Sequence, residues 1–427
     1  MGLGLKKRTF CPHGVLNGTN EAKRVVGNLA CQHDTYLQRL STTVCDCQKN
    51  SLKKPSKDEA YEVQFLDTIL FPEGGGQPWD HGSVVAMKDG QPTEIPVRKV
   101  LRRKLEAIHY VPTPIEVGTQ VELKLDFDRR FDQAQQHSGQ HLLSAVLDTL
   151  DIPTLAWSMG PELVYIEVPR LPEDLKAVER QCNKHIADNL TITVTETRER
   201  PKNLPADYDA SAGVIRVVSI GGIDANPCCG THVRSTAELN SLTILYTNPI
   251  KGANRNNHRI YFVVGGRCQK LLSEVHGNAR TMGANLSCQI SDLPEKITVM
   301  QNQLKELMKR EKNLKSDLVQ FDSQVVRAKL EKTGKAYLHK PTGDIEYLNA
   351  LLAALPNPIP GICVLVAGER DGGPIVITGE ETQVKELSAR VKQALPAMKG
   401  GGRPQKFQGK VAAYAAKDLV FLGNLLD

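Results

Sequence analysis

The sequence predicts a mixed α+β protein built from several parts, and three observations support this fold class. Segments with the two-residue alternation of strands are interspersed with segments of helical period, and their order is not the regular strand–helix alternation of a parallel sheet. Residues 297–328 repeat apolar positions in steps of three and four, as a long helix does. The chain has 427 residues, 40% of them apolar, which is enough for two or three domains with hydrophobic cores.

The first 128 residues are predicted to form an extension and a β-rich domain. Residues 1–29 carry several cations but no continuous apolar core, so we expect a disordered extension; a transit peptide is the alternative. Residues 30–128 are expected to form a β-barrel-like N-terminal domain. Within it, residues 62–70 and 121–127 alternate like half-buried strands, and the turn-rich segment 72–78 follows the first of them.

The period changes near residue 129, where a second domain is predicted that extends to residue 270. We expect one helix from there to about residue 150 and another over residues 172–189. Short strands are predicted around them, over residues 163–168, 191–197, 214–220, 242–246 and 259–264. Helices and short strands in this mixed order favour an α+β domain over a doubly wound parallel sheet.

Residues 271–335 are predicted to be a long helical segment that contains a coiled-coil seam. The apolar positions of the seam are Ile297, Met300, Leu304, Leu307, Leu314, Leu318, Phe321, Val325 and Ala328. Only Glu311 interrupts the series, and a helix over residues 297–328 would be about 48 Å long. Such a seam can act as a spacer, as a homodimer contact through residues 297–328, or as the packed face of an intramolecular hairpin. The sequence leaves these alternatives open.

Residues 336–427 are predicted to form a small α/β C-terminal domain. Apolar residues at 362–366 indicate a buried strand, and residues 380–395 indicate a helix. A glycine-rich loop is predicted at residues 399–405, and it contains Gly401 and Arg403. Glycine lets a backbone approach phosphate closely, and cations flank this run, so both residues are candidate nucleic-acid contacts. A mobile surface loop is the alternative.

The bulk composition restricts the class of protein. The chain has no run of 18 apolar residues, so no membrane span is expected. Ten cysteines are too few for a disulfide scaffold, and without a secretory signal they favour a reducing compartment, the cytoplasm. The net charge of +6 is mild, but the cations are clustered. Arg129, Arg130, Lys251 and Arg255 belong to such clusters and are candidate contacts to a phosphate backbone; solvated faces are the alternative.

Two short segments carry residues with metal-ligand chemistry. His137 and His141 are four residues apart on a predicted helix, so both imidazoles lie on one face and can reach one ion. Cys228 and His232 are also four residues apart, in a segment where a turn or a helix start is expected. Imidazole and thiolate ligands favour Zn²⁺. Either pair alone is more typical of ordinary surface or buried residues, but both pairs together predict one zinc ion per chain.

The sequence leaves two points about this site open, namely which cysteine is the sulfur ligand and whether the metal is structural or catalytic. Cys228 and Cys229 are adjacent, and adjacent side chains rarely point at one ion; the spacing to His232 favours Cys228, with Cys229 as the alternative. Four protein ligands would close a tetrahedral zinc site, as in structural sites, whereas a catalytic site keeps a position for water or substrate. A metal-bound water is a nucleophile near neutral pH, so the same residues suggest a hydrolase.

These two segments resemble a known family. His-x-x-x-His followed by Cys-x-Gly-Thr-His is similar to the editing domain of alanyl-tRNA synthetases and of the free-standing alanyl-tRNA editing proteins, the AlaX family, with the threonyl-tRNA synthetase editing domain as a more distant relative. Residues 66–78 and 252–265 resemble two further stretches of that family, and residues 400–404 resemble the glycine motif of the synthetase's C-terminal tRNA-binding domain. The family's Cys-Gly-Gly-Thr-His has Cys229 in place of its first glycine here, and in this register the ligand is Cys228.

The resemblance implies a zinc-dependent editing domain over residues 129–270 that hydrolyses the ester of mischarged tRNA(Ala). Ser-tRNA(Ala) is the main substrate it implies, with Gly-tRNA(Ala) as a second one, in support of translation fidelity. Nothing in the chain resembles an aminoacylation module, so the editing would occur in trans. A zinc-stabilised tRNA- or RNA-binding protein without catalytic activity is the alternative function.

The resemblance also implies substrate contacts. Thr68 matches the residue that would contact the serine hydroxyl, although a strand former is an equally ordinary reading of a threonine there. Gly74, Gly75 and Gly76 would let backbone N–H groups approach the substrate. Gln77 is either a pocket contact or a turn residue, and the turn is the preferred interpretation.

Overall fold

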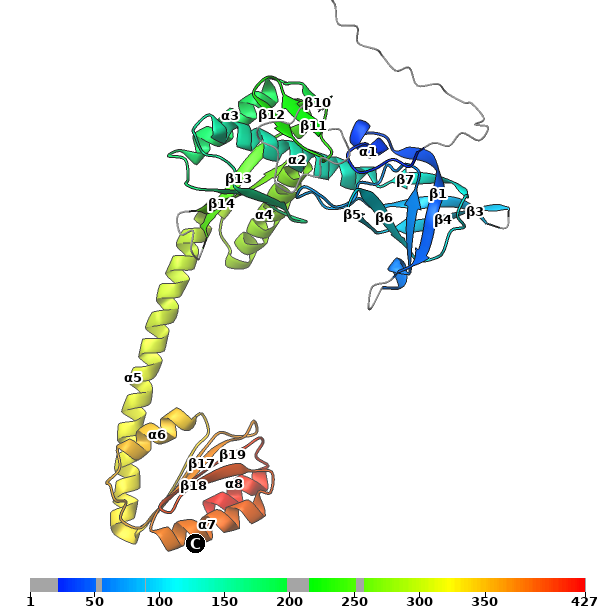
Figure 1. Ribbon diagram of the computed structural model, residues 1–427. Coiled ribbons are helices and arrows are strands. Elements are labelled where there is room, and N and C mark those ends of the chain that lie inside the picture. Colours follow the sequence, from blue (N-terminus) through cyan, green and yellow to red (C-terminus); the bar gives the residue numbers. More distant parts are fainter. Residues whose placement is uncertain (1–21, 51–55, 89, 198–214, 251–256, 427) are drawn as a thin grey trace, which may run out of the picture. The chain divides into compact units, whose positions relative to one another are not determined.

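The computed structural model describes residues 22–50, 56–88, 90–197, 215–250 and 257–426. The chain divides into two compact units, Met1–Asn278 and Ala279–Asp427 (Figure 1). The mixed α+β class is confirmed. The finer division at residues 29, 128, 270 and 335 stays a prediction, and the expected boundary at residue 270 falls inside helix α4 (Gly266–Leu286).

The N-terminal part of the first unit is a curled, half-barrel sheet of seven strands in the order β4-β3-β7-β1-β2-β6-β5, and all neighbours are antiparallel. The strands are β1 (Arg39–Lys49), β2 (Tyr61–Phe65), β3 (Gly82–Lys88), β4 (Gln91–Val97), β5 (Lys99–Arg103), β6 (Glu106–Val111) and β7 (Gln120–Leu125). Two short helices accompany them, α1 (Ala30–His33) and η1 (Lys57–Glu59). Alternating residues such as Val63, Val121 and Leu123 form the core of this sheet.

The strand predicted over residues 62–70 ends earlier than expected, at Phe65. Asp67 accounts for the early end, because its carboxylate accepts hydrogen bonds from the N–H groups of Ala30 (2.9 Å) and Thr68 (2.7 Å). Such local acceptors favour turns over continued strand pairing. The chain after Asp67 therefore leaves the sheet and leads into the glycine segment 74–76.

The rest of the first unit packs helices on two smaller sheets. Helix α2 (Phe127–Asp148) begins at Asp126, whose carboxylate accepts from Arg129 N. One sheet has the order β13-β14-β9-β8 and the other β10-β11-β12. The elements are β8 (Ala156–Met159), β9 (Val164–Val168), α3 (Leu175–Ala187), β10 (Ile192–Thr197), β11 (Ile215–Ile220), β12 (Asp224–Pro227), η3 (Thr236–Leu239), β13 (Leu242–Pro249) and β14 (His258–Val264). All the helices and strands predicted in this region are confirmed within a few residues.

Helix α2 lies close against strand β14 because the helix residue at the contact is Gly139. A Cβ on Gly139 would lie 2.4 Å from a methyl carbon of Val264 in β14, which is closer than packed atoms can approach. The apolar face of the helix, including Leu142, Leu143 and Val146, joins the core of this region. The close packing fixes the helix that carries His137 and His141.

Arg130 corrects one expectation from the sequence. It is fully buried, and its guanidinium pairs with the equally buried carboxylate of Asp80. It also donates to the carbonyls of Ile69 (2.6 Å) and Thr35 (3.0 Å). A buried charge of this kind is retained only when it is paired and hydrogen-bonded. The contacts of Arg130 therefore connect α2 to the half-barrel, and its buried guanidinium is not available to contact tRNA.

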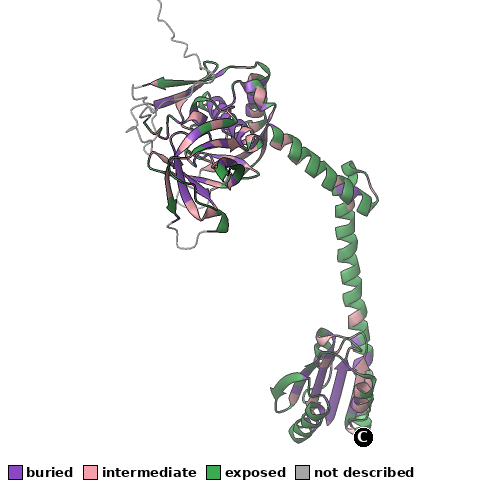
Figure 2. Cartoon of the chain, turned by 90° about the vertical axis from the view of Figure 1, so that its right-hand side faces the viewer, coloured by how far each residue is buried: buried purple, intermediate pink, exposed green. Residues whose placement is uncertain are grey.

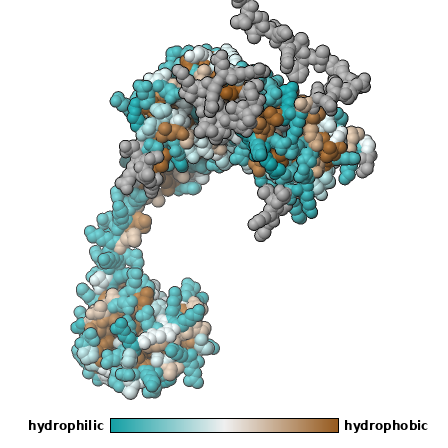
Figure 3. All heavy atoms as spheres, viewed as in Figure 1, coloured by the Kyte–Doolittle hydropathy of each residue, from teal (hydrophilic) through white to brown (hydrophobic). Residues whose placement is uncertain are grey.

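The helical segment is confirmed as two helices, α4 and α5 (Leu293–Thr333), joined through η4 (Ile290–Asp292). Helix α5 has Pro294 in its first turn and is followed by Gly334, whose φ of 68° is the left-handed conformation common just after helix ends. Most of its length is exposed (Figure 2), and hydrophobic side chains are visible among hydrophilic ones along it (Figure 3). Within the described ranges, no helix is both long enough and apolar enough to cross a membrane.

The second unit contains a five-stranded sheet of order β15-β16-β17-β19-β18, in which only β15 and β16 are parallel. Its elements are β15 (Lys335–Lys340), α6 (Ile345–Ala353), β16 (Ile362–Ala367), β17 (Gly373–Gly379), α7 (Glu381–Ala394), β18 (Lys399–Arg403), β19 (Lys406–Val411) and α8 (Ala416–Gly423). The buried strand and the helix predicted here are confirmed as β16 and α7. The apolar residues of β16 belong to two cores, one on each side of the sheet.

The glycine-rich loop predicted at residues 399–405 is wrong, because most of this run is the edge strand β18. Gly400 and Gly402 face the backbone of β19 so closely that an added Cβ would meet it at 2.5 and 2.0 Å. The glycines therefore permit close strand pairing rather than a loop. Gly401 has open space around its Cα, and Arg403 is exposed, so both remain candidate contacts.

Candidate metal centre

The four predicted ligands lie together in the first unit. The ligand atoms of His137, His141, Cys228 and His232 are all within 4.8 Å of one another, and all four residues are buried. Helix α2 supplies the two histidines, whose ring centroids are 5.3 Å apart, because a four-residue step stacks them on one helix face. The segment that follows β12 supplies Cys228 and His232.

The segment after β12 is held by a buried arginine. Arg216 of β11 donates to the carbonyls of Cys228 (3.2 Å) and Gly230 (3.0 Å), and its other nitrogen donates to Gln32 O (2.7 Å). In return, Cys228 N donates to Arg216 O (3.1 Å). Gly230 is required here, because a Cβ would lie 2.2 Å from the ring of His137. The turn between Cys228 and His232 is thus fixed against both β11 and α2.

Each histidine of the cluster has a hydrogen-bond partner at its outer ring nitrogen, which is an amide oxygen, a hydroxyl or a carboxylate. His137 Nδ1 lies 2.9 Å from Gln77 Oε1, His232 Nδ1 lies 3.1 Å from Ser138 Oγ, and His141 Nδ1 lies 3.3 Å from Asp224 Oδ2. An acceptor at Nδ1 places the proton there and leaves the Nε2 lone pair free. Outer partners of this kind orient the histidine ligands of metal sites.

The orientation of the Gln77 amide follows from its other contacts. Thr231 N, which can only donate, lies 3.0 Å from Gln77 Oε1, while Gln77 Nε2 donates to Thr231 Oγ1 (2.9 Å). The oxygen that faces His137 is therefore the acceptor, and His137 carries its proton on Nδ1. Gln77 is fully buried and is the partner of a candidate metal ligand, so the preferred interpretation as a simple turn residue is incomplete.

The inner nitrogens converge on the cysteine. His137 Nε2 and His232 Nε2 each lie 3.3 Å from Cys228 Sγ. Ordinary zinc–nitrogen and zinc–sulfur bond lengths place such ligand atoms about 3.5 Å apart in a tetrahedral site. The cluster therefore has the spacing, the burial and the three-nitrogen, one-sulfur donor set that a Zn²⁺ ion would fit.

The electrostatics of the cluster agree with ligand chemistry. Burial raises the pKa of Cys228, but its interactions with the surrounding histidines, His137, His232 and His141, outweigh burial and hold that pKa well below the ordinary value. Burial lowers the pKa of His232 to about 3 and also lowers that of His137. These shifts favour a thiolate and two neutral imidazoles, which are the forms that bind metal.

The pKa of His141 is shifted in the opposite direction from those of the other two histidines. Burial lowers its pKa, but the hydrogen bond to Asp224 and the contact with Cys228 outweigh burial and raise the pKa to about 9. The raised pKa means that a proton is held beside the thiolate of Cys228. A bound cation would take the place of that proton, so metal binding at this cluster would release it.

The glycine segment lies against the metal centre. Gly75 and Gly76 have φ values of 58° and 81°, which glycine adopts without strain. A Cβ on Gly76 would lie 2.5 Å from Trp157, whose ring centroid is 4.6 Å from that of His137. A Cβ on Gly75 would lie 3.2 Å from Cys229 Sγ. Cys229 thus packs on the turn and is not a member of the metal cluster.

Thr68 lies inside the half-barrel, 2% exposed, with its hydroxyl 2.8 Å from His109 Nε2. His109 Nδ1 lies 3.2 Å from Val63 O and carries the proton, so Thr68 donates to Nε2. The hydroxyl also accepts from Leu70 N (3.0 Å). Burial lowers the pKa of His109 to about 4, which keeps it neutral. The described contacts of the Thr68 hydroxyl are all within the protein, and its contact with substrate stays a prediction.

The basic candidates are distributed over the molecule. Arg129 is partly exposed at the start of α2 and donates through Nε (3.1 Å) and Nη2 (2.9 Å) to Trp79 O. Lys251 and Arg255 lie outside the described residues. Gly401 and Arg403 belong to the second unit.

Sequence reasoning missed the partners that orient the ligands. Ser138 could have been suspected from its place between two candidate ligands. Asp224 and Arg216 had no signal, since Asp and Arg are common in the chain and neither belongs to a recognisable spacing. Their roles depend on β11 and β12 pairing beside α2.

The comparisons with known proteins agree with this centre. Residues 215–261 match the family described as the threonyl and alanyl tRNA synthetase second additional domain. The rat (Rattus norvegicus) alanyl-tRNA editing protein Aarsd1 is 35% identical over 398 residues, which cover 89% of this chain and 93% of the relative. The chain belongs to the alanyl-tRNA editing protein family. This finding confirms the resemblance found in the sequence.

Two further members of the family come from distant organisms. The putative alanyl-tRNA editing protein alaX of Saccharomyces cerevisiae is 32% identical over 446 residues, 94% of this chain and 97% of the relative. The alanyl-tRNA editing protein AlaX-L of Pyrococcus horikoshii is 27% identical over 395 residues, 89% of this chain and 93% of the relative. Both matches extend over nearly the whole of each chain.

The cluster predicts different outcomes for the two adjacent cysteines. Cys228→Ala removes the sulfur at which the imidazole nitrogens converge, so zinc affinity should fall by more than the roughly 10- to 100-fold that loss of an outer partner costs. Cys229→Ala should leave the zinc content of the purified protein nearly unchanged. Elemental metal analysis measures both. Full zinc in Cys228→Ala together with loss in Cys229→Ala would reverse the assignment.

The acceptor at His141 should contribute measurably to metal affinity. Asp224→Ala leaves the Nδ1–H without a buried acceptor, and zinc affinity should fall roughly 10- to 100-fold in a competition titration with a chelator. Asp224→Asn keeps an acceptor oxygen and should lose less. Asp188→Ala, which removes an exposed carboxylate paired with Lys184 at the end of α3, is the control. Equal affinities in Asp224→Ala and Asp188→Ala would contradict the role of Asp224.

Proposed function

We propose that this protein is a trans-editing hydrolase that removes the wrong amino acid from mischarged tRNA(Ala), chiefly from Ser-tRNA(Ala) and also from Gly-tRNA(Ala). The relatives are named as alanyl-tRNA editing proteins, and their matches extend over nearly the whole chain. The described cysteines are all free, which suits a reducing compartment, and we place the activity in the cytoplasm.

One observation carries the proposal: the ligand atoms of three imidazoles and one cysteine lie within 4.8 Å of one another in a buried cluster, and each imidazole has a hydrogen-bond partner at Nδ1. Bound there, Zn²⁺ would supply positive charge to orient the aminoacyl-adenosine end and to polarise its ester carbonyl or a water. The chain's own part is to hold the four ligands in deprotonated form and to bring the substrate end to them.

The glycine segment is suited to holding that substrate end. Gly74, Gly75 and Gly76 have no side chains, so the substrate end could approach their backbone, and Gln77 joins the same turn to His137. The N–H of Gly74 already donates to Gln77 O, which leaves the N–H groups of Gly75 and Gly76 for the substrate. The half-buried Trp157 lies between Gly76 and His137 and restricts water on that side. Thr68 remains the candidate for contact with the serine hydroxyl.

The need for such an activity follows from the limits of binding selectivity. A pocket built for the methyl group of alanine rejects an added hydroxyl or a missing methyl poorly, by roughly 10- to 200-fold. A second site that hydrolyses the wrong ester raises the overall selectivity. A polar contact in that second site would favour serine, which has a hydroxyl, over alanine, which has none.

Purified zinc-loaded protein should therefore hydrolyse Ser-tRNA(Ala) much faster than its spontaneous rate, Gly-tRNA(Ala) more slowly, and correctly charged Ala-tRNA(Ala) least. Release of labelled amino acid from each tRNA measures this. Cys228→Ala is the inactive control and Cys229→Ala the active one.

The contrary result separates the proposal from its rival. If Ser-tRNA(Ala) persists at its spontaneous rate while the protein still binds the tRNA, the chain is a zinc-stabilised RNA-binding protein without catalytic activity.

We also propose that the seam of α5 joins two copies of the chain. Its apolar residues, such as Leu304, Leu307 and Leu314, are about 60% exposed, whereas the helix packs a different face, with Val326 and Leu330, on its own unit. A heptad stripe of exposed leucines is what a coiled-coil partner covers. The second copy offers the same stripe, so it is the occupant that matches without further assumptions.

The full chain should therefore sediment as a dimer at micromolar concentration. The double variant Leu307→Glu/Leu314→Glu places charges on the seam and should be monomeric, because like charges would face each other across it. Lys305→Glu changes the charge of the same helix away from the seam and should remain dimeric. Analytical ultracentrifugation distinguishes these states, and a monomeric wild type would contradict the proposal.

A further inference from the structure

A cavity of about 660 Å³ adjoins the metal centre on the side of the glycine segment. It is lined by residues 73–79, by Leu101 and Arg102 of β5, and by Ser158 and Met159 of β8. Gln77 belongs to both places, since it lines the cavity and its amide oxygen faces His137 Nδ1. The volume is that of an ordinary small-ligand pocket, large enough for one nucleotide.

Arg102 is the cation at this cavity, and it differs from its neighbours in β5. Lys99 pairs with Glu59 (3.1 Å), and Arg103 pairs with Glu62 through both carboxylate oxygens (2.9 and 2.8 Å). Arg102 donates from Nε to Lys104 O (2.7 Å), and none of the described acidic groups lies within ion-pair distance of it. Its Nη1 lies about 4 Å from the position of a Cβ on Gly74, so the guanidinium extends over the turn.

The glycine turn adds donors to the same wall. Gly74 N is used by Gln77 O, but the described residues supply no acceptor for the N–H groups of Gly75 and Gly76, and both glycines are exposed. Unused N–H groups in a turn with left-handed residues form anion-binding sites. Together with an unpaired guanidinium they offer the charge and the donors that a phosphate oxygen requires.

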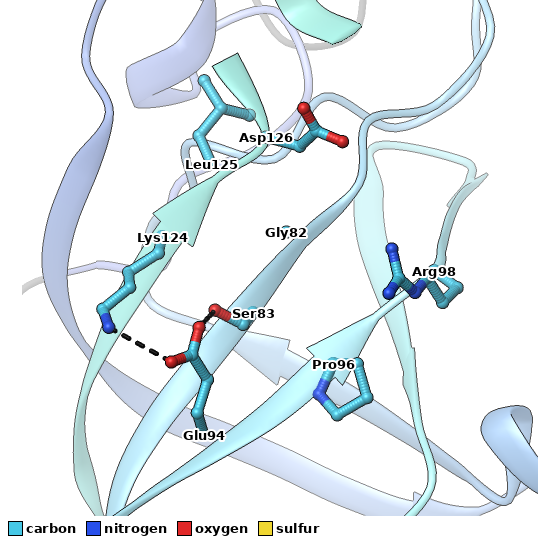
Figure 4. Close-up of a pocket in the computed structure, with 8 residues that line it drawn as sticks. All are labelled: Gly82, Ser83, Glu94, Pro96, Arg98, Lys124, Leu125 and Asp126. Carbon is cyan, nitrogen blue, oxygen red and sulfur yellow. Dashed lines mark hydrogen bonds and ion pairs between the residues drawn. The ribbon is translucent and has the colours of Figure 1, made fainter. Parts of the chain in front are cut away.

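A second cavity of the half-barrel lacks this character (Figure 4). It is lined by Lys124 and Arg98, but the carboxylate of Glu94 lies among them, accepts from Ser83 and pairs with Lys124 at 3.3 Å. Asp126 lines it as well. Its two carboxylates balance its two cations, and Lys124 is already paired with one of them. The cavity under Arg102 is also lined by one carboxylate, that of Glu73, but Glu73 forms no ion pair with Arg102 among the described residues, so the guanidinium keeps its charge for an anion.

We propose that the cavity under Arg102 is a subsite for the phosphodiester that precedes the 3′-terminal adenosine of the tRNA. This inference rests on the proposed function, in which the ester on that adenosine reaches the metal centre. One ribose separates the ester from this phosphate, and the glycine turn connects the two places. Arg102 and the N–H groups of Gly75 and Gly76 bind the phosphate, and the nucleotide occupies the rest of the cavity.

The phosphate contact is tested first by binding. Arg102→Ala should bind uncharged tRNA roughly tenfold more weakly than wild type. Its slope of log affinity against log salt should be smaller by about 0.7, the value for one phosphate of a single strand. Arg103→Ala removes a cation that Glu62 already neutralises, so it should bind within twofold of wild type. Equal binding and equal slopes for Arg102→Ala and Arg103→Ala would overturn the inference.

The second measurement compares two esters. Arg102→Ala should lower kcat/KM for Ser-tRNA(Ala) roughly tenfold and leave kcat/KM for 3′-O-seryl adenosine, which has no phosphate, within twofold of wild type. Arg102→Lys keeps the charge and should recover part of the loss on tRNA. An equal loss on both esters would show that Arg102 supports the fold or the metal centre, and no loss on either would show no contact.

The two measurements separate the inference from the function on which it rests. If the wild type hydrolyses neither ester, the proposed hydrolase activity fails. The binding comparison between Arg102→Ala and Arg103→Ala then still decides whether this cavity binds phosphate.

Discussion

The metal centre depends on one constraint: each buried imidazole must direct its Nε2 lone pair inward, and this requires an acceptor for the proton on Nδ1. The acceptors are Gln77, Ser138 and Asp224, and they come from the turn after β2, from α2 and from β12. A buried N–H without an acceptor costs about 1–3 kcal/mol, and an unsupported ring loses its direction. The half-barrel and the region around α2 are therefore both needed to complete one site.

Two buried guanidinium groups hold these parts together. Arg130 joins α2 to the half-barrel through Asp80 and two carbonyls, and Arg216 joins the segment after β12 to helix α1. Their geometry fixes the segments on which the ligands and acceptors are placed. Because a buried charge that loses its partner costs about 3–5 kcal/mol, these contacts resist separation of the parts. The same burial explains why Arg130 does not serve nucleic-acid binding.

Prediction from the sequence succeeded where a feature is local and failed where it depends on distant partners. The spacing of His137 and His141 reflects helical geometry, and the heptads of α5 reflect its period, so both could be recognised in the residues alone. The glycine run of β18 was assigned to a loop because close pairing with β19 is not visible in sequence. Arg130 and Arg102 cannot be told apart as cations in the sequence. In the structure Asp80 pairs with Arg130 in the core, whereas the acids near Arg102, Glu59 and Glu62, pair with its neighbours Lys99 and Arg103.

The candidate metal centre has four protein ligands, and this number limits how much of the substrate the centre itself can recognise. Four protein ligands would complete a tetrahedron around a bound Zn²⁺ ion, so a substrate atom would have to enter as an additional ligand or replace one of them. A site of this kind contributes charge and orientation, but it offers little surface to the nucleotide. The exposed glycine turn supplies that surface: it contacts the centre through Gln77 and Trp157 and borders the cavity under Arg102. Under the proposed function, recognition of the nucleotide and chemistry at the ester would therefore meet in one turn, in which the positive φ values of Gly75 and Gly76 favour glycine.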